Sequence, residues 1–154
     1  DTSFVRTLLT AKAVRALPGG FRALLRSDLG ASWVDDFDKL PPTERFFAGG
    51  DVSIRGFDID ELGPEDANGE VVGGRYLAVG SVEIEKAVAD DWGVAAFVDA
   101  GNAYGGSGSS TGLRIGTGAG VRWYSPIGPV RLDVAHPLDD DTLVRIHVRI
   151  GPDL

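Results

Sequence analysis

The chain has 154 residues, which permits one domain, and it is 43% hydrophobic with a mean hydropathy of +0.00. Its net charge of -8 argues against a nucleic-acid partner, and the absence of cysteine excludes disulfides, thiolate metal sites and a cysteine nucleophile. No stretch approaches the roughly 20 consecutive apolar residues of a transmembrane helix, so a membrane protein of this sequence would have to be a β-barrel.

Seven segments have the alternation and composition of β-strands, and no segment is predicted to form a helix. In chain order they are Ser3–Ala16, Phe21–Trp33, Gly74–Ala87, Trp92–Tyr104, Gly112–Tyr124, Pro129–His136 and Thr142–Ile150. The alternation is most regular in the last segment, where Val144, Ile146 and Val148 are separated by polar side chains. A period of two gives a strand one apolar and one polar face, so the predicted fold class is all-β and antiparallel.

The connections between these strands alternate in length. The short ones are Leu17–Gly20, Val88–Asp91 and Ser125–Gly128. The longer ones are Gly105–Thr111, Pro137–Asp141 and Val34–Gly73, the last with about forty residues. Tight turns at one end of a sheet and longer loops at the other are typical of outer-membrane β-barrels. A soluble sandwich is the alternative, because alternation within a strand does not distinguish lipid from a protein core.

The Val34–Gly73 connection is predicted to be a folded loop. It contains Arg45-Phe46-Phe47-Ala48-Gly49-Gly50 and then Ile54-Arg55-Gly56-Phe57. Connections of this length are usually functional or disordered, and this one is not of low complexity. Aromatic residues and glycines around a single arginine favour a loop that packs against another part of the molecule.

Four segments make the sequence recognisable: "RFFAGGDVSIRGFDIDELGP", "GGRYLAVGSVEIE", "AAFVDAGNAY" and "GTGAGVRWYSPIGPVRLDVAHPL". In this order they resemble the barrel of the bacterial outer-membrane assembly-factor superfamily, which includes the BamA and TamA barrels. The resemblance covers essentially the whole chain, and the nearest branch is TamA, the outer-membrane subunit of the translocation and assembly module. It implies an antiparallel transmembrane barrel of sixteen strands that follows periplasmic POTRA domains.

The resemblance implies that residues 1–154 are the C-terminal part of one outer-membrane β-barrel domain. The predicted strands would be the tenth to the sixteenth, and the N-terminal strands and POTRA domains would be absent from this chain. An odd number of strands agrees with a partial barrel, because single-chain bacterial barrels are usually even-numbered and an open sheet has two edges. The loop at about 34–73 would be the sixth extracellular loop, folded inward into the lumen.

The resemblance also assigns a motif that joins the loop to the barrel wall. Its members are the loop tip Ile54, Arg55, Gly56 and Phe57, the acidic wall residue Glu83, and the strand element Phe97, Asp99 and Gly101.

The chemistry of these residues suits the assignment. Arg55 has donors in a planar fork, which fits carboxylates on neighbouring strands. Glu83 and Asp99 alternate with apolar residues, so both are expected to point into a polar lumen. Gly56 permits a close backbone approach or a positive φ, and Phe57 is expected to wedge into the contact between loop and wall.

The glycine-rich segment Gly116-Thr117-Gly118-Ala119-Gly120 is not predicted to bind phosphate. It lacks the lysine and the following helix of a phosphate-binding loop. Small residues that face the lumen and leave room for the inward loop explain it better.

The end of the last predicted strand is expected to pair poorly. Gly151 and Pro152 close it, and proline has no backbone N–H to give to a neighbouring strand. The resemblance places a lateral seam at this strand, where a client strand would add by β-augmentation.

The predicted function is the assembly and insertion of outer-membrane proteins, including autotransporters, in the bacterial outer membrane. No enzymatic activity, cofactor or metal site is expected. The implied partners are outer-membrane lipid, a TamB-like periplasmic protein and client outer-membrane proteins. Two alternatives are a related barrel, serving as a secretion pore or as the anchor of a fused hydrolase, and a soluble all-β binding domain.

The two histidines do not suggest a catalytic site. Asp133, His136 and Ser125 could in principle form a triad, but they lack the strand–turn–helix context of a nucleophile elbow. His147 alternates toward the lumen and is expected to join the polar wall.

Overall fold

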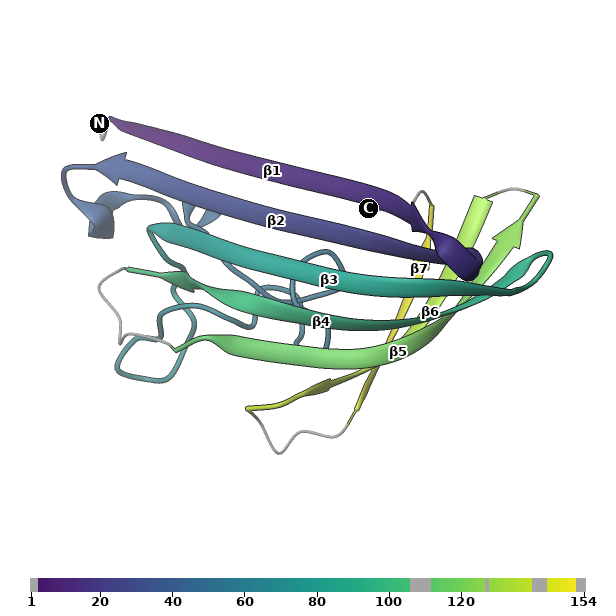
Figure 1. The fold of residues 1–154 in the computed structure, drawn as a ribbon. Helices are drawn as coiled ribbons and strands as arrows, with labels where there is room; N and C mark the ends of the chain where they lie inside the picture. The colour runs from purple at the N-terminus through teal and green to yellow at the C-terminus, as the bar shows by residue number, and fades with distance from the viewer. Residues whose placement is uncertain (1–2, 106–111, 127, 140–143, 152–154) are drawn as a thin grey trace.

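A computed structural model describes residues 3–105, 112–126, 128–139 and 144–151. Its seven strands form one antiparallel sheet in which neighbours in sequence are neighbours in space (Figure 1). The strands are β1 (Phe4–Leu17), β2 (Phe21–Val34), β3 (Tyr76–Ala89), β4 (Trp92–Tyr104), β5 (Arg114–Ser125), β6 (Gly128–Pro137) and β7 (Arg145–Ile150). The all-β antiparallel prediction is therefore confirmed.

The predicted strand boundaries agree with the structure to within two residues, except for the start of the last strand, which cannot be compared. The strand predicted from Gly74 begins at Tyr76, because Gly74 pairs with Phe46 of the long loop in an isolated bridge instead of joining the sheet. The last strand is described from Arg145, and its predicted start at Thr142 lies outside the described residues.

Helical structure in the described part of the chain is confined to three short 3-10 segments. These are η1 (Pro18–Gly20), η2 (Phe37–Lys39) and η3 (Pro42–Glu44). Among the described residues, no helix has the length and apolar character needed to cross a membrane.

The sheet has an apolar face and a polar face, as the alternation predicts. On β3 and β4 the outward residues Val82 and Val98 are about half exposed, whereas Glu83 and Asp99 on the opposite face are buried. The same holds on β7, where Ile146 is 69% exposed and His147 is 7% exposed. The buried face is thus the polar one, which is the reverse of a soluble sandwich.

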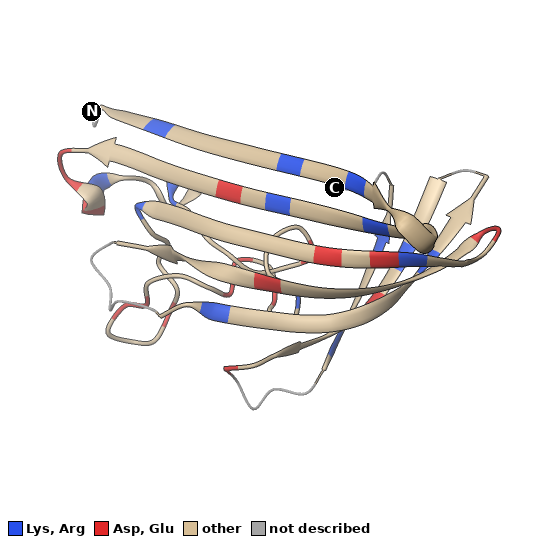
Figure 2. Ribbon diagram, viewed as in Figure 1, with Lys and Arg blue, Asp and Glu red and all other residues tan. Residues whose placement is uncertain are grey.

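The long loop between β2 and β3 covers the polar face. The sheet curves, with β6 and β7 turning away from β1 and β2, and the loop lies on its concave side (Figure 1). In the described chain β1 and β7 are the two edges of the sheet, and β1 is exposed along its whole length. The acidic positions on β3 and β4 lie on adjacent, paired strands (Figure 2).

Candidate functional site

A small apolar cluster fixes the loop on the sheet. Its buried members are Ala48, Ile54, Phe57 and Leu62 from the loop, together with Val79 from β3. Ile54 is fully buried and Phe57 is 3% exposed, so both side chains lie within this cluster. Burial of such side chains stabilises the docked loop by roughly 1.5–3 kcal/mol each relative to exposure.

Arg55 extends from this cluster to the polar wall and contacts both predicted carboxylates. Its Nε and Nη2 donate to the two oxygens of Asp99, at 2.7 and 2.9 Å, and its Nη1 donates to Glu83 Oε2 at 2.6 Å. Its backbone N–H also donates to Asp99, at 3.1 Å. Burial alone would lower the pKa of the Arg55 guanidinium, but hydrogen bonds and charge attraction, from Asp99 above all, raise the pKa above its ordinary value.

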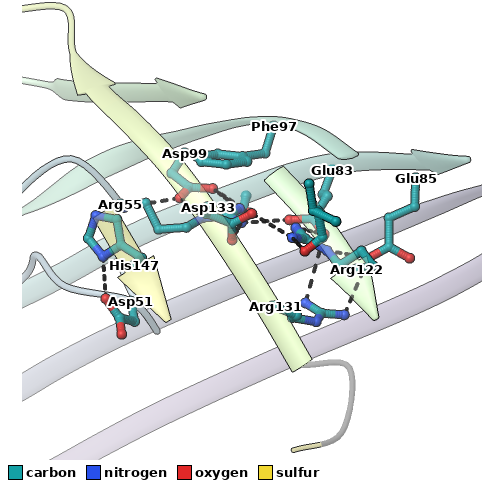
Figure 3. A network of polar contacts seen from close by, with 12 residues as sticks. Asp51, Arg55, Glu83, Glu85, Phe97, Asp99, Arg122, Arg131, Asp133 and His147 are labelled. Atoms are coloured by element: carbon teal, nitrogen blue, oxygen red, sulfur yellow. Dashed lines mark hydrogen bonds and ion pairs between the residues drawn. The ribbon is translucent and has the colours of Figure 1, made fainter. Parts of the chain in front are cut away.

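Phe97 and Asp133 complete the surroundings of the Arg55 guanidinium (Figure 3). The guanidinium carbon lies 3.3 Å from the centre of the Phe97 ring, so the arginine is stacked on an aromatic face. Asp133 of β6 accepts a further bond from Nη1, at 3.1 Å. Phe97 was expected in the motif, whereas Asp133 was not.

A second arginine, Arg122 of β5, lies behind the first and was missed by the sequence analysis. It is fully buried and donates to Glu85 at 3.0 Å, to Glu83 at 2.8 Å and to Asp133 at 2.5 Å. Glu83 and Asp133 each give one oxygen to Arg55 and the other to Arg122. The two guanidinium groups are therefore linked through shared carboxylates.

The network continues toward the turn end of the sheet. Glu85 also contacts Arg131, at 3.4 Å, and Arg22 of β2, whose Nε donates to it at 2.8 Å. Among the groups joined by these bonds, four carboxylates (Glu83, Glu85, Asp99 and Asp133) face three wall arginines (Arg22, Arg122 and Arg131) and the loop arginine Arg55. Arg55 is the member of this network that the long loop contributes.

Glycines allow the loop to approach the wall this closely. A Cβ built on Gly116 of β5 would lie 1.9 Å from the carbonyl oxygen of Arg55, and one on Gly120 would lie 1.8 Å from Asp133 Oδ1. The interpretation of the glycine-rich segment as room for the inward loop is therefore confirmed at Gly116, whereas Gly120 leaves room for the wall carboxylate of Asp133. Gly56 has the predicted positive φ, of 99°.

The remaining predicted residues lie at the margins of this site. Gly101 belongs to the predicted strand element and has a φ of 154°, with no room for a Cβ because Ala78 O would be 2.2 Å away. Gly151 follows β7 and its N–H donates to Pro129 O at 3.0 Å, while Pro152 lies outside the described residues. The assignment of these two residues to a seam stays a prediction.

The two histidines lie on opposite faces of the sheet. His136 is exposed on the outer face of β6, and no catalytic arrangement with Asp133 is present in the described structure, since Asp133 points inward to the arginines. His147 lies on the polar inner face, as expected, and contacts the loop. Within the described residues no cluster of three or more His, Asp or Glu side chains is arranged to hold a metal ion.

An antiparallel sheet with an exposed apolar outer face, a charged inner wall and a long loop folded onto that wall is the arrangement of part of an outer-membrane β-barrel. Comparison with known proteins agrees with this arrangement and also identifies the protein family. The profile of the Omp85 superfamily domain matches residues 1–153, and the chain belongs to this superfamily.

Similar proteins include two bacterial assembly factors and one chloroplast protein. Outer membrane protein assembly factor BamA of Nitratidesulfovibrio vulgaris is 30% identical over 146 residues, which cover 91% of this chain and 18% of that protein. BamA of Neisseria meningitidis serogroup B is 29% identical over 151 residues, covering 73% of this chain and 19% of that protein. Outer envelope protein 80, chloroplastic, of Arabidopsis thaliana is 33% identical over 123 residues, covering 73% of this chain and 15% of that protein.

A solved structure supports the fold. The crystal structure of BamA from Haemophilus ducreyi lacking POTRA domains 1–3 has a TM-score of 0.70 to this chain at 20% identity, over 94% of this chain and 33% of that one. The chain spans about a fifth of the length of the curated relatives it matches. These relatives carry BamA and chloroplast names, so the matches support the superfamily but give no support to the narrower TamA resemblance.

Proposed function

We propose that this chain is the C-terminal part of a barrel that assembles and inserts proteins in the bacterial outer membrane. The observation that carries the proposal is the docking of the loop through Arg55 onto Asp99, Glu83 and the Phe97 ring. Membership of the Omp85 superfamily and the similarity to BamA proteins support it. Assembly factors of this family are not enzymes, and no covalent chemistry is proposed.

In this proposal Arg55, Gly56 and Phe57 hold the loop inside the lumen, while the exposed outer face contacts lipid. The wall groups Glu83, Phe97 and Asp99 receive the arginine. The partners are client outer-membrane proteins, whose strands add to an open strand edge by main-chain hydrogen bonds. Gly151 and Pro152 would leave such an edge at the end of β7, because proline donates no hydrogen bond to a ladder.

The test uses the full-length protein, reconstituted in lipid vesicles with an unfolded outer-membrane protein as client. An Arg55→Ala variant is expected to insert into the membrane as well as the wild type but to assemble the client more slowly. A variant of the exposed loop residue Lys39, Lys39→Ala, serves as the matched control. Client assembly at the wild-type rate by Arg55→Ala would refute the proposed role of the docked loop.

A TamA-like role, with a TamB-like periplasmic partner and autotransporter clients, is a narrower hypothesis within the same function. Capture of a TamB-like protein by the full-length chain from its own envelope would support it. Restoration of general outer-membrane protein assembly in cells depleted of BamA would instead support a BamA-like role.

A further inference from the structure

The tip of the long loop contacts β7 as well as β3 and β4. The backbone N–H of Gly56 donates to Nε2 of His147, at 3.0 Å. The other ring nitrogen, Nδ1, contacts the carboxylate of Asp51, which belongs to the same loop (Figure 3). One buried imidazole on β7 thus holds two points of the loop.

These contacts define the form of the imidazole that fits the site. A nitrogen that accepts from a backbone N–H carries no proton, so Nε2 must be the unprotonated nitrogen. Nδ1 then carries the proton, and its N–H donates a hydrogen bond to the Asp51 carboxylate. Both nitrogens of the neutral ring are satisfied, which accounts for a histidine only 7% exposed among charged neighbours.

A second contact joins the same loop to β7. Arg145 lies two residues before His147 on the same face, and its guanidinium contacts the carboxylates of Asp58 and Glu61, the latter at 3.2 Å. Basic and imidazole groups on β7 therefore face acidic groups on both sides of the loop tip.

We propose that His147 is a positioning residue that couples the docked loop to β7. Arg55 fixes the loop on β3 and β4, and His147 extends the same attachment to the opposite part of the sheet. β7 is hydrogen-bonded to β6, and the loop contacts its inner face through His147 and Arg145. Release of the loop would free the inner face of β7, and movement of β7 would loosen the loop tip.

This inference rests on the proposed docking of the loop, but its test needs no client protein. Hydrogen exchange of the Gly56 amide and of the β7 amides is measured in the full-length protein in lipid nanodiscs. Two substitutions separate the ring nitrogens: His147→Gln places an acceptor near the position of Nε2, whereas His147→Asn places its amide near Nδ1. Gly56 exchange is expected to stay close to wild type in His147→Gln and to be about tenfold faster in His147→Asn, the effect of losing one hydrogen bond of about 1.4 kcal/mol.

The exchange of β7 amides is expected to follow that of Gly56 in both variants, because the two are coupled. His136→Asn, on the exposed face of β6, is the matched control and should change neither. Arg145→Gln tests the other contact between β7 and the loop, at a less buried side chain. It should accelerate amide exchange at residues 58–61 of the loop. Equal Gly56 exchange in the Gln and Asn variants, or β7 exchange that stays at the wild-type rate while Gly56 accelerates, would overturn the inference. Because client assembly is not measured, these outcomes leave the proposed function to its own test.

Discussion

The guanidinium of Arg55 binds both oxygens of the Asp99 carboxylate, through Nε at 2.7 Å and Nη2 at 2.9 Å. Paired bonds of this kind combine charge with direction, because the planar fork of arginine matches the plane of a carboxylate. Both groups are buried, since Arg55 is 6% exposed and Asp99 is 0% exposed. The attachment of the long loop thus includes one side chain whose removal would leave charged partners out of water.

Substitution of Arg55 is expected to release the loop. Arg55→Ala leaves Asp99 and Glu83 facing each other without the loop cation, which should weaken docking by about 3–5 kcal/mol, and by less where lumen water screens the charges. Arg55→Lys should restore docking only in part, since lysine lacks the fork. Proteolysis of the loop in the full-length protein measures this, with Lys39→Ala as control. A loop equally resistant in Arg55→Ala and wild type would show that the apolar cluster alone holds it.

A larger residue at position 116 is expected to have a similar effect without touching any charge. In Gly116→Ala the new Cβ would lie 1.9 Å from the Arg55 carbonyl oxygen, so the loop or β5 must move. Overpacking of this kind costs about 1–3 kcal/mol. Gly80→Ala on β3 is the matched control, because its Cβ would have Arg26 O as its nearest atom, at 3.9 Å. Loop proteolysis should rise in Gly116→Ala alone, and similar rates in the two variants would contradict the steric explanation.

Most strands could be predicted from the sequence because their side chains alternate between an exposed and a buried face, most regularly on β4 and β6. Along β7, for example, Ile146 and Val148 face out while His147 faces in. The predicted boundaries failed by two residues at Gly74, where pairing with Phe46 decides the start of β3. Such a contact depends on how the loop folds, which the local pattern does not contain.

The candidate site could be predicted only where a motif carried it. The contacts of Arg55 with Glu83 and Asp99 were expected, but those of Arg122 and Asp133 were not. Alternation places Arg122 on the inner face of its strand, yet it does not give the register between strands. The sharing of carboxylates depends on that register, because Gly120 is paired with Asp133 and leaves space for the carboxylate.

Arg122 is expected to matter for the stability of the barrel rather than for the position of the loop alone. It is fully buried among Glu83, Glu85 and Asp133, and removal of one member of a buried ionic network costs about 3–5 kcal/mol. Arg122→Met should lower the free energy of unfolding of the full-length protein by that order. Denaturant unfolding in detergent micelles measures it, and Lys39→Met in the exposed loop segment η2 is the control. A stability equal to wild type would mean that the carboxylates find other partners when Arg122 is absent.

The outward position of Ile146 gives a test of the membrane orientation of the sheet. Its side chain is 69% exposed on β7, with Val148 and Val144 also exposed at 58% each. If this face meets lipid, Ile146→Arg moves a charge into hydrocarbon and should lower the free energy of unfolding by about 2–4 kcal/mol near the midplane, and by less toward the interface. Ile59→Arg provides the control, since Ile59 is 80% exposed in the long loop and its substitution should have little effect. Unfolding in lipid vesicles is the measurement, because in water an exposed isoleucine could be replaced by arginine at little cost. A neutral effect of Ile146→Arg in lipid would show that this face of β7 meets water or protein instead.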